Sequence, residues 1–489
     1  MTFTREVGTL LHRPAYVHVT LSSRKILASR KHRGCRSSTN SQVDLCNLEL
    51  PAGSLGLPLI GETLNLLLKG DSFGADRNAR YGAIWKTNIL GSPTIMVFDE
   101  AACRKVLKEE GRLVEVIWPD VTADLVGPAS LNLLKGEEHL RMKRVLGEAF
   151  SEQAVAALMP ELEACAHSFC QRWAQLGSFS GYEESKYWAW AMFGATVLGM
   201  PGQLSMGRKL ARLNDELQSG FQTLPVKLPA SPYSRALAAR QAMADLINQQ
   251  IDALQSQERG HSCLENMLAL EDPSSSGSPL NRHQISDNII AAAFGNASAG
   301  PTAAKILQYL GAGSRARGLV SAELAAHAPH GPLTPAVLDR LPYTNAVVQE
   351  ILRITPIVPA LFRRALQDFE LCGCRVPKGW SVYVHTGAST QQYNQDSFQP
   401  ERWLQGQGSD SFQEAASSGC PAATEYMLPF GLGPRMCLGR HLVKAALTVL
   451  VIVLVRGYSW QMEDPEEQWS VFPTVQPKQG LEVTSFRKQ

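Results

Sequence analysis

A ten-residue loop, Phe430-Gly431-Leu432-Gly433-Pro434-Arg435-Met436-Cys437-Leu438-Gly439, leads directly into the apolar segment Leu442–Val455. The core of that segment, Leu447–Val455, is too short to span a bilayer, and it predicts a helix buried inside a globular protein. The three glycines allow positive φ and close backbone approach where a Cβ would clash. Amides at the start of the following helix would favour a thiolate at the single cysteine. The loop is therefore suited to bring a thiolate close to a flat prosthetic group. The alternative is a buried structural cysteine beside a tight turn.

This loop resembles the haem-ligand signature of the cytochrome P-450 family, Phe-x-x-Gly-x-Arg-x-Cys-x-Gly, with every defined position filled. The resemblance implies haem b as the cofactor and Cys437 as the axial ligand of its iron. It also places Phe430, Arg435 and Gly439 at the cofactor, with the ring covering the sulfur and the guanidinium meeting a haem carboxylate. Electron donation from the sulfur favours breaking an O–O bond, which is the chemistry of a monooxygenase.

The resemblance covers roughly Leu50 to Met462 and implies the fold of the family. That fold is mainly α with small β-sheets (α+β), in a single large catalytic domain that we assign to residues 47–489. Formal net charge is only +2, from 47 Lys and Arg against 45 Asp and Glu, so nothing indicates nucleic acid as a partner. Ten cysteines are scattered without zinc-like spacing, which fits a reducing compartment.

Residues 1–46 differ in composition from the rest of the chain. They contain eight Lys or Arg but only two acids, Glu6 and Asp44, together with several serines. This bias is typical of an organelle transit peptide, and we favour a chloroplast address. No run of 18 apolar residues occurs there, so the amino-terminal membrane anchor common in the family is not expected. The alternative is a disordered basic tail on a protein of the cytosol or the endoplasmic-reticulum surface.

Between this segment and the cysteine loop the pattern is mostly helical. Ile84–Leu90 and Thr94–Phe98 predict a hairpin, helical periodicity dominates from Glu100 to about Asn345, and short strands return around Phe369–Val384. Leu224–Tyr233 contains three prolines, which exclude a helix interior and predict a stiff loop. It resembles the loop over the substrate channel in the branch of sterol-type, brassinosteroid, abscisic-acid and retinoic-acid hydroxylases. That resemblance implies a small, apolar, isoprenoid-derived substrate.

Three further cations are candidates for the haem propionates. His139 and Lys143 lie four apart and therefore on one helix face. In similar segments of the family such residues bond to a propionate, although a lysine offers a point charge in place of a bidentate fork. The register of the segment around Phe362 resembles retinoic-acid hydroxylases and implies the same role for Arg363, with Arg364 a near-equal candidate.

A structural trio is implied by two other motifs. Glu350 and Arg353 lie three apart, and Arg402 follows in Phe398–Trp403. In the family the corresponding glutamate and two arginines bond to one another. We expect the trio to fix the backbone around the cysteine loop, and its loss to release haem.

The sequence departs from the family in the helix expected over Asp287–Thr302. The family has an acid followed by threonine here, which relay protons during oxygen activation. This chain has Ser298 and Ala299 at those positions, and Pro301 should kink the helix. Ser298, Thr302 and water could form a substitute relay, the protein could rearrange a peroxide, or it could bind haem and do little chemistry. The stretch 385–396 is also several residues shorter than the family pattern.

The sequence therefore predicts a haem-thiolate monooxygenase that hydroxylates an apolar isoprenoid, sterol or retinoid-like molecule with O2. Electrons would come from an external protein, a ferredoxin or an NADPH-dependent reductase, and the protein could contact a membrane peripherally. The rivals are an isomerase or lyase acting on lipid hydroperoxides, and a haem-binding protein of low activity.

Overall fold

The computed structural model describes residues 45–58, 60–70, 72–89, 91–255, 260–272, 278–355, 357–387, 398–404, 429–470 and 475–489. The chain divides into two units, Met1–Ser41 and Gln42–Gln489. The first unit lies outside the described residues, and so does nearly all of the segment 1–46 predicted as a transit peptide or basic tail. Most of the stretch 385–396, predicted to be shortened, lies outside them as well.

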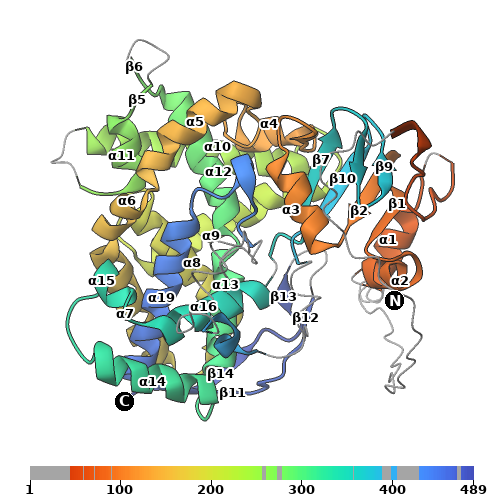
Figure 1. Cartoon of the computed structure of the whole chain (residues 1–489). Helices are drawn as coiled ribbons and strands as arrows, with labels where there is room; N and C mark the ends of the chain where they lie inside the picture. The colour runs from red at the N-terminus through yellow and green to blue at the C-terminus, as the bar shows by residue number, and fades with distance from the viewer. Residues whose placement is uncertain are drawn as a thin grey trace, which may run out of the picture. The chain divides into compact units, whose positions relative to one another are not determined.

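The second unit is mainly helical, as predicted (Figure 1). Several helices begin at a side-chain cap: for example, the Asp99 side chain accepts from Ala102 N, and Ser262 and Glu265 form a capping box. The α-helices are α1 Thr63–Lys69, α2 Ser72–Tyr81, α3 Glu100–Lys108, α4 Val121–Val126, α5 Gly136–Ala149, α6 Glu152–Ala157, α7 Met159–Leu176, α8 Gly181–Thr196, α9 Leu204–Ser219, α10 Pro232–Leu254, α11 Cys263–Ala269, α12 Arg282–Asn296, α13 Ala299–Tyr309, α14 Arg315–His327, α15 Pro335–Leu338, α16 Pro342–Ile354 and α19 Arg440–Gly457. Short 3-10 helices are η1 Leu45–Asn47, η2 Gly220–Gln222, η4 Pro400–Trp403 and η6 Gly433–Arg435.

The strands are short and form small sheets. They are β1 Ile84–Ile89, β2 Ser92–Val97, β3 Val114–Val116, β4 Phe179–Ser180, β5 Glu271–Asp272, β6 Ser278–Pro279, β7 Ala360–Ala365, β8 Phe369–Leu371, β9 Cys374–Val376, β10 Ser381–His385, β11 Tyr458–Met462, β12 Trp469–Ser470, β13 Gln476–Pro477 and β14 Glu482–Lys488. The largest sheet has the order β1-β2-β10-β7-β3, and β11-β14-β4 form a second one. β1 and β2 pair antiparallel, which confirms the predicted hairpin.

The five-stranded sheet positions one buried cation. Strand β7 lies between β10 and β3, with Arg363 opposite Val382 on one side and Val116 on the other. Because side chains alternate along a strand, Arg363 is 2% exposed whereas its neighbour Arg364 is exposed. The sequence did not decide whether Arg363 or Arg364 is the candidate for a haem propionate. In the structure the side chain of Arg363 is the one directed into the protein.

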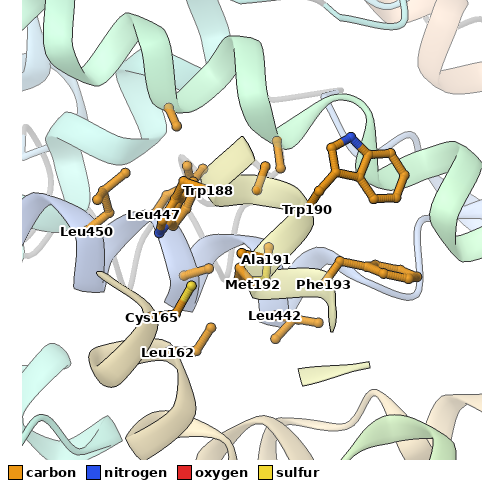
Figure 2. Packing of buried hydrophobic residues seen from close by; sticks show 14 of the residues in the cluster. Leu162, Cys165, Trp188, Trp190, Ala191, Met192, Phe193, Leu442, Leu447 and Leu450 are labelled. Atoms are coloured by element: carbon orange, nitrogen blue, oxygen red, sulfur yellow. The ribbon is translucent and has the colours of Figure 1, made fainter. Parts of the chain in front are cut away.

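Helix α19 is the buried helix predicted after the cysteine loop. Leu447, Leu450 and the valines around them have almost no exposed surface. Figure 2 shows α19 side chains packed against Trp188 of α8 and Leu162 of α7. This apolar contact fixes the direction in which α19 starts, and therefore the position of the loop that precedes it.

The helix expected over Asp287–Thr302 is interrupted. It consists of α12, which ends at Asn296, and α13, which begins at Ala299. Pro301 has no N–H with which to bond the carbonyl of Ala297, so the hydrogen-bond ladder cannot continue through this point. The predicted kink is confirmed as a break between two helices.

Candidate active site

In the cysteine loop, Gly431 lies at the end of a turn and Gly433 lies very close to the backbone of α3. Gly431 and Gly433 both have φ of +69°, and a Cβ at Gly433 would lie 2.6 Å from the carbonyl oxygen of Leu107 in α3. Only glycine fits there. Gly439 has φ of −75°, so the expectation of a special conformation was wrong for this glycine, which is the residue at the N-terminal cap of α19.

Cys437 is the exposed cysteine among those in the described residues. The protein packed around its sulfur limits hydration and raises the pKa of the thiol, while the backbone amide of Gly439 and the charge of Arg440 act in the opposite direction. A Cβ on Gly439 would lie 4.0 Å from the sulfur. Phe430 lies beside the loop, and its carbonyl accepts from the amide of Cys437 at 2.9 Å.

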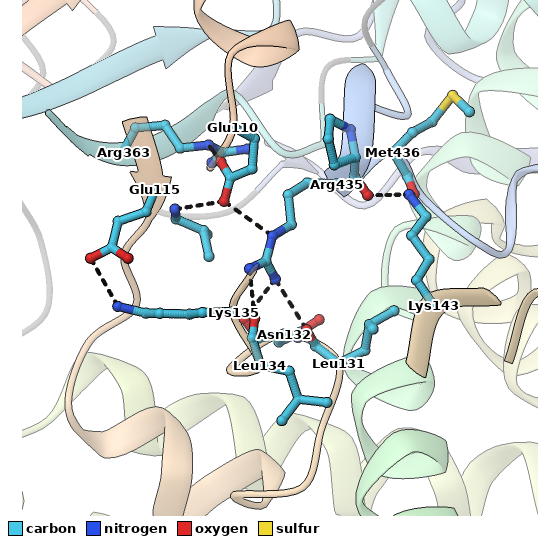
Figure 3. Close-up of polar contacts among 12 residues, drawn as sticks. Glu110, Glu115, Leu131, Asn132, Leu134, Lys135, Lys143, Arg363, Arg435 and Met436 are labelled. Atoms are coloured by element: carbon cyan, nitrogen blue, oxygen red, sulfur yellow. Dashed lines mark hydrogen bonds and ion pairs between the residues drawn. The ribbon is translucent and has the colours of Figure 1, made fainter. Parts of the chain in front are cut away.

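Arg435 and Arg363 meet at a carboxylate that the sequence did not single out. Glu110 follows α3, and its Oε1 lies 3.2 Å from Nε of Arg435 while its Oε2 lies 2.7 Å from Nε of Arg363 (Figure 3). Burial lowers the pKa of both guanidinium groups, and Glu110 opposes that shift. No spacing marks Glu110 in the sequence, because it shares no helix face or motif with either arginine.

Arg435 also holds the segment that follows α4. Its Nη1 donates to the carbonyl of Leu131 at 3.1 Å and its Nη2 to that of Leu134 at 2.6 Å. The amide of Leu131 in turn donates to the side chain of Asn288 in α12. A short path of hydrogen bonds therefore joins the cysteine loop to the interrupted helix.

His139 and Lys143 lie on α5, close to this cluster. His139 is 3% exposed, and burial, followed by the charges of Arg435 and Lys143, lowers its pKa to about 4. It is therefore neutral at pH 7. The ammonium of Lys143 donates to the carbonyls of Pro434 and Met436, two residues of the cysteine loop (Figure 3). Burial lowers the pKa of Lys143 to about 8, so it carries its charge at pH 7.

The structure brings Glu350, Arg353 and Arg402 together. Glu350 has no exposed surface, and its two oxygens accept from Nε and Nη2 of Arg353, both at 2.8 Å. Nε of Arg402 lies 3.1 Å from Oε1. Two donors were missed from the sequence: the amide of Gln399, at 2.9 Å, and the indole N–H of Trp403, at 2.9 Å. This single carboxylate therefore ties α16 to η4.

Both hydroxyls predicted as a relay lie at the break between α12 and α13. Ser298 donates to the carbonyl of Gly295 at 2.9 Å, and Thr302 donates to the carbonyl of Ser298 at 2.9 Å. Thr302 is buried, and Ala299 beside it offers no hydroxyl. Each hydroxyl keeps a lone pair with which to accept a hydrogen bond from water. No carboxylate occurs at either position.

An aromatic cluster forms around Phe294 of α12, one turn before the break between α12 and α13. The ring centroid of Phe294 is 5.0 Å from that of Phe221 in η2 and 6.5 Å from that of Trp118 after β3. The three rings come from segments far apart in sequence, and Trp118 is 37% exposed. Such a group of rings offers an apolar, flat surface.

Comparison with known proteins gives the same architecture. The sequence profile of the family described as cytochrome P450 matches residues 51–484. This chain belongs to the cytochrome P450 family. It is therefore a haem-dependent monooxygenase with the fold predicted from its cysteine loop.

Its relatives include other cytochromes P450 and a hydroxylase. The chain is 31% identical to cytochrome P450 26C1 of Homo sapiens over 471 residues, covering 89% of this chain and 88% of that one. It is 29% identical to abscisic acid 8'-hydroxylase 4 of Arabidopsis thaliana, covering 95% of both. Among solved structures, retinoic acid bound cyanobacterial CYP120A1 is 25% identical with a TM-score of 0.79, covering 90% of this chain and 100% of that one.

The residues present fit a haem. Cys437, an exposed residue, lies on a loop whose glycines keep side-chain bulk away. Next to it lie three cations, Arg363, Arg435 and Lys143, which suit the two carboxylates of haem b, and a neutral histidine. Cys437, the exposed cysteine on this loop, is the candidate ligand for a haem iron. The described residues contain no group of three or more His, Cys, Asp or Glu that could hold a metal ion.

Proposed function

We propose that this protein hydroxylates an apolar, isoprenoid-derived molecule of the retinoid or abscisic-acid type. The observation that carries the substrate class is the cluster of Trp118, Phe221 and Phe294 beside the break between α12 and α13. Flat rings make favourable contacts with a rigid polyene or cyclohexenyl skeleton, and they offer no partner for a strongly polar one. The names of two similar proteins, abscisic acid 8'-hydroxylase 4 and retinoic acid bound CYP120A1, support the same class.

Each residue then has a defined task. Haem supplies oxygen activation when it is bound. Cys437 would ligate its iron, while Arg363, Arg435, Lys143 and His139 would hold the propionates. Ser298 and Thr302 would accept and pass on protons through water at the break in the helix, since the usual acid and threonine are missing. Glu350, with its four partner groups, would hold the segment beside the cysteine loop.

A binding screen tests the substrate class. Retinoids, abscisic-acid precursors, sterols and carotenoid-derived compounds are titrated into the ferric protein, and displacement of the sixth iron ligand is followed as a shift of the Soret band. We expect at least one isoprenoid to shift the band, and Phe294→Ala to weaken its binding by about 1–3 kcal/mol, as for the loss of one buried aromatic contact. A response confined to hydrophilic compounds would contradict the proposal.

A second function is favoured by one specific feature. Ala299 has no hydroxyl and Ser298 no charge, which suits an enzyme that rearranges a lipid hydroperoxide and needs no proton delivery to O2. The two functions differ in their use of oxygen. A monooxygenase consumes O2 in step with product, whereas the isomerase works without air and without an electron donor.

We propose an acidic one-electron donor of the ferredoxin type. Arg440 and Lys444 lie in the first two turns of α19, directly after the cysteine loop, and Arg440 donates to the carbonyl of Cys437 at 3.3 Å. Positive charge at this position favours an acidic partner over a basic one. Arg440→Glu should slow reduction by ferredoxin, and the rate in the unmodified protein should fall as salt is raised. A rate independent of salt would favour an uncharged mode of docking.

We also propose peripheral contact with a membrane surface. Helix α1 exposes Leu64, Leu67 and Leu68, which lie on one face and are 56%, 62% and 76% exposed. No helix in the described part of the chain has the length and apolarity needed to cross a bilayer. Leu67→Ser with Leu68→Ser should reduce sedimentation with liposomes. Leu319→Ser, a change at another exposed leucine, serves as the control and should leave sedimentation unchanged.

The chloroplast address is a separate proposal that rests on the composition of residues 1–46. A fusion of this segment to a fluorescent protein should enter chloroplasts and be cleaved there. Diffuse fluorescence in the cytosol would instead support the basic-tail alternative.

A further inference from the structure

A buried carboxylate lies between the two arginines at the proposed propionate site. The side chain of Glu110 is 6% exposed, that of Arg363 2% and that of Arg435 10%. A carboxylate this deeply buried needs compensation, and here each oxygen faces a different guanidinium group, as Figure 3 shows.

The backbone fixes the position of Glu110. Its Oε1 also accepts from the amide of Val116 in β3 at 2.9 Å. Val116 pairs with Arg363 across the sheet, so β3, the neighbour of the strand that carries the arginine, holds the carboxylate. Glu110 follows α3, the helix that approaches Gly433 in the cysteine loop. The carboxylate is therefore held by α3 and β3 together.

Glu110 meets both arginines at their Nε atoms. That of Arg435 donates to Oε1 at 3.2 Å, whereas that of Arg363 lies 2.7 Å from Oε2 as an ion pair without hydrogen-bond geometry. Nη1 of Arg363 donates to the carbonyl of Phe362, and within the described part of the chain no acceptor is assigned to its Nη2. Nη2 of Arg435 has two hydrogens, of which Leu134 takes one. Each guanidinium group thus keeps donor capacity for a propionate while Glu110 fixes its orientation.

The charges of the cluster then balance. Arg363, Arg435 and Lys143 carry one positive charge each at pH 7, and His139 is neutral. Glu110 reduces the sum over these side chains to +2, which the charge of −2 on two haem propionates would offset; Arg440 and Cys437, which also act on Lys143, are not in this sum. Without Glu110 the site would carry one uncompensated positive charge in a region where water screens poorly.

We propose that Glu110 is a positioning residue for the haem, one that orients Arg363 and Arg435 and sets the charge, and hence the reduction potential, of the haem site. This inference rests on the proposed propionate role of the two arginines. A negative charge near the iron stabilises its more positive, oxidised state, so removing that charge should raise the midpoint potential.

The test measures the midpoint potential of haem-loaded protein. Glu110→Gln keeps the shape of the side chain and loses its charge, and we expect its potential to shift to more positive values. Glu109→Gln is the matched control, because Glu109 is the preceding residue and pairs with the exposed Arg112. Its potential should equal that of the unmodified protein. Equal potentials in Glu110→Gln and the unmodified protein would overturn the inference.

A second comparison covers the case in which Glu110→Gln does not fold. Arg363→Gln removes one positive charge and should lower the potential, and the double variant with Glu110→Gln should return it toward the original value. If the potential of the double variant did not move back toward the original value, the proposal would be overturned. If Glu110 had only a structural role, its replacement would lower the free energy of unfolding, but the midpoint potential of the double variant would not return toward the original value. If the unmodified protein fails to load haem through Cys437, the proposed function fails. If it loads haem and only these shifts are missing, this inference alone fails.

Discussion

Replacement of Glu350 by glutamine tests the most heavily bonded side chain of the structure. Glu350 has no exposed surface and accepts five hydrogen bonds from Arg353, Arg402, Trp403 and the amide of Gln399. Glutamine has nearly the same shape, but its NH2 group cannot accept. Whichever way the glutamine amide turns, its NH2 group replaces one of the two carboxylate oxygens. The N–H donors that now bond to that oxygen would then face another donor.

The expected loss of stability follows from the burial of Arg353. Its side chain is 2% exposed, and the variant removes the carboxylate that neutralises it. Breaking a buried pair in this way costs about 3–5 kcal/mol. We therefore expect Glu350→Gln to lower the free energy of unfolding by about 4 kcal/mol, and to lower the haem content because η4 is released from α16.

Urea unfolding followed by tryptophan fluorescence, with haem per chain measured in parallel, provides the assay. Glu401→Gln is the matched control, since Glu401 lies in the same η4 and its ion pair with Arg315 is largely exposed. That pair should contribute less than about 1 kcal/mol. If Glu350→Gln lost no more stability than this control, the reasoning from burial would be refuted.

Two further predictions concern pH and proton delivery. The fold lowers the pKa of His139 from 6.5 to about 4, so the unfolded chain binds the proton more readily and the protein loses stability as the pH falls below about 6.5. Between pH 7.5 and pH 5 we expect the free energy of unfolding to fall by about 2 kcal/mol, and we expect His139→Leu to abolish this fall. An equal fall in that variant would contradict the assignment. Ser298→Glu with Ala299→Thr restores the family's acid and alcohol and should lower the ratio of hydrogen peroxide to oxygenated product, whereas an unchanged ratio would show that the helix break is not the point at which protons enter.

The parts of the structure that were predictable are those with a local cause. The hairpin of β1 and β2, the break before α13 and the burial of α19 follow from turn residues, a proline and an apolar run. The grouping of Glu350 with Arg353 and Arg402 came from resemblance, because the last residue lies about fifty positions away.

What the sequence could not predict depends on tertiary contacts. Glu110 meets Arg363 and Arg435 only because α3, β7 and the cysteine loop converge, and it precedes each arginine by more than 250 positions. Lys143 was expected at a propionate, yet in the structure it donates to two carbonyls of the cysteine loop. Every residue has a backbone carbonyl, so a sequence does not indicate which carbonyls accept hydrogen bonds from a given side chain.

The central claim is that the Cys437 thiolate binds a haem iron. It is tested most directly by the absorption spectrum of the reduced protein under carbon monoxide. We predict the red-shifted Soret band of a thiolate-ligated haem in the unmodified protein and its loss in Cys437→Ala. Absence of the band in the unmodified protein, or its persistence in the variant, would contradict the account.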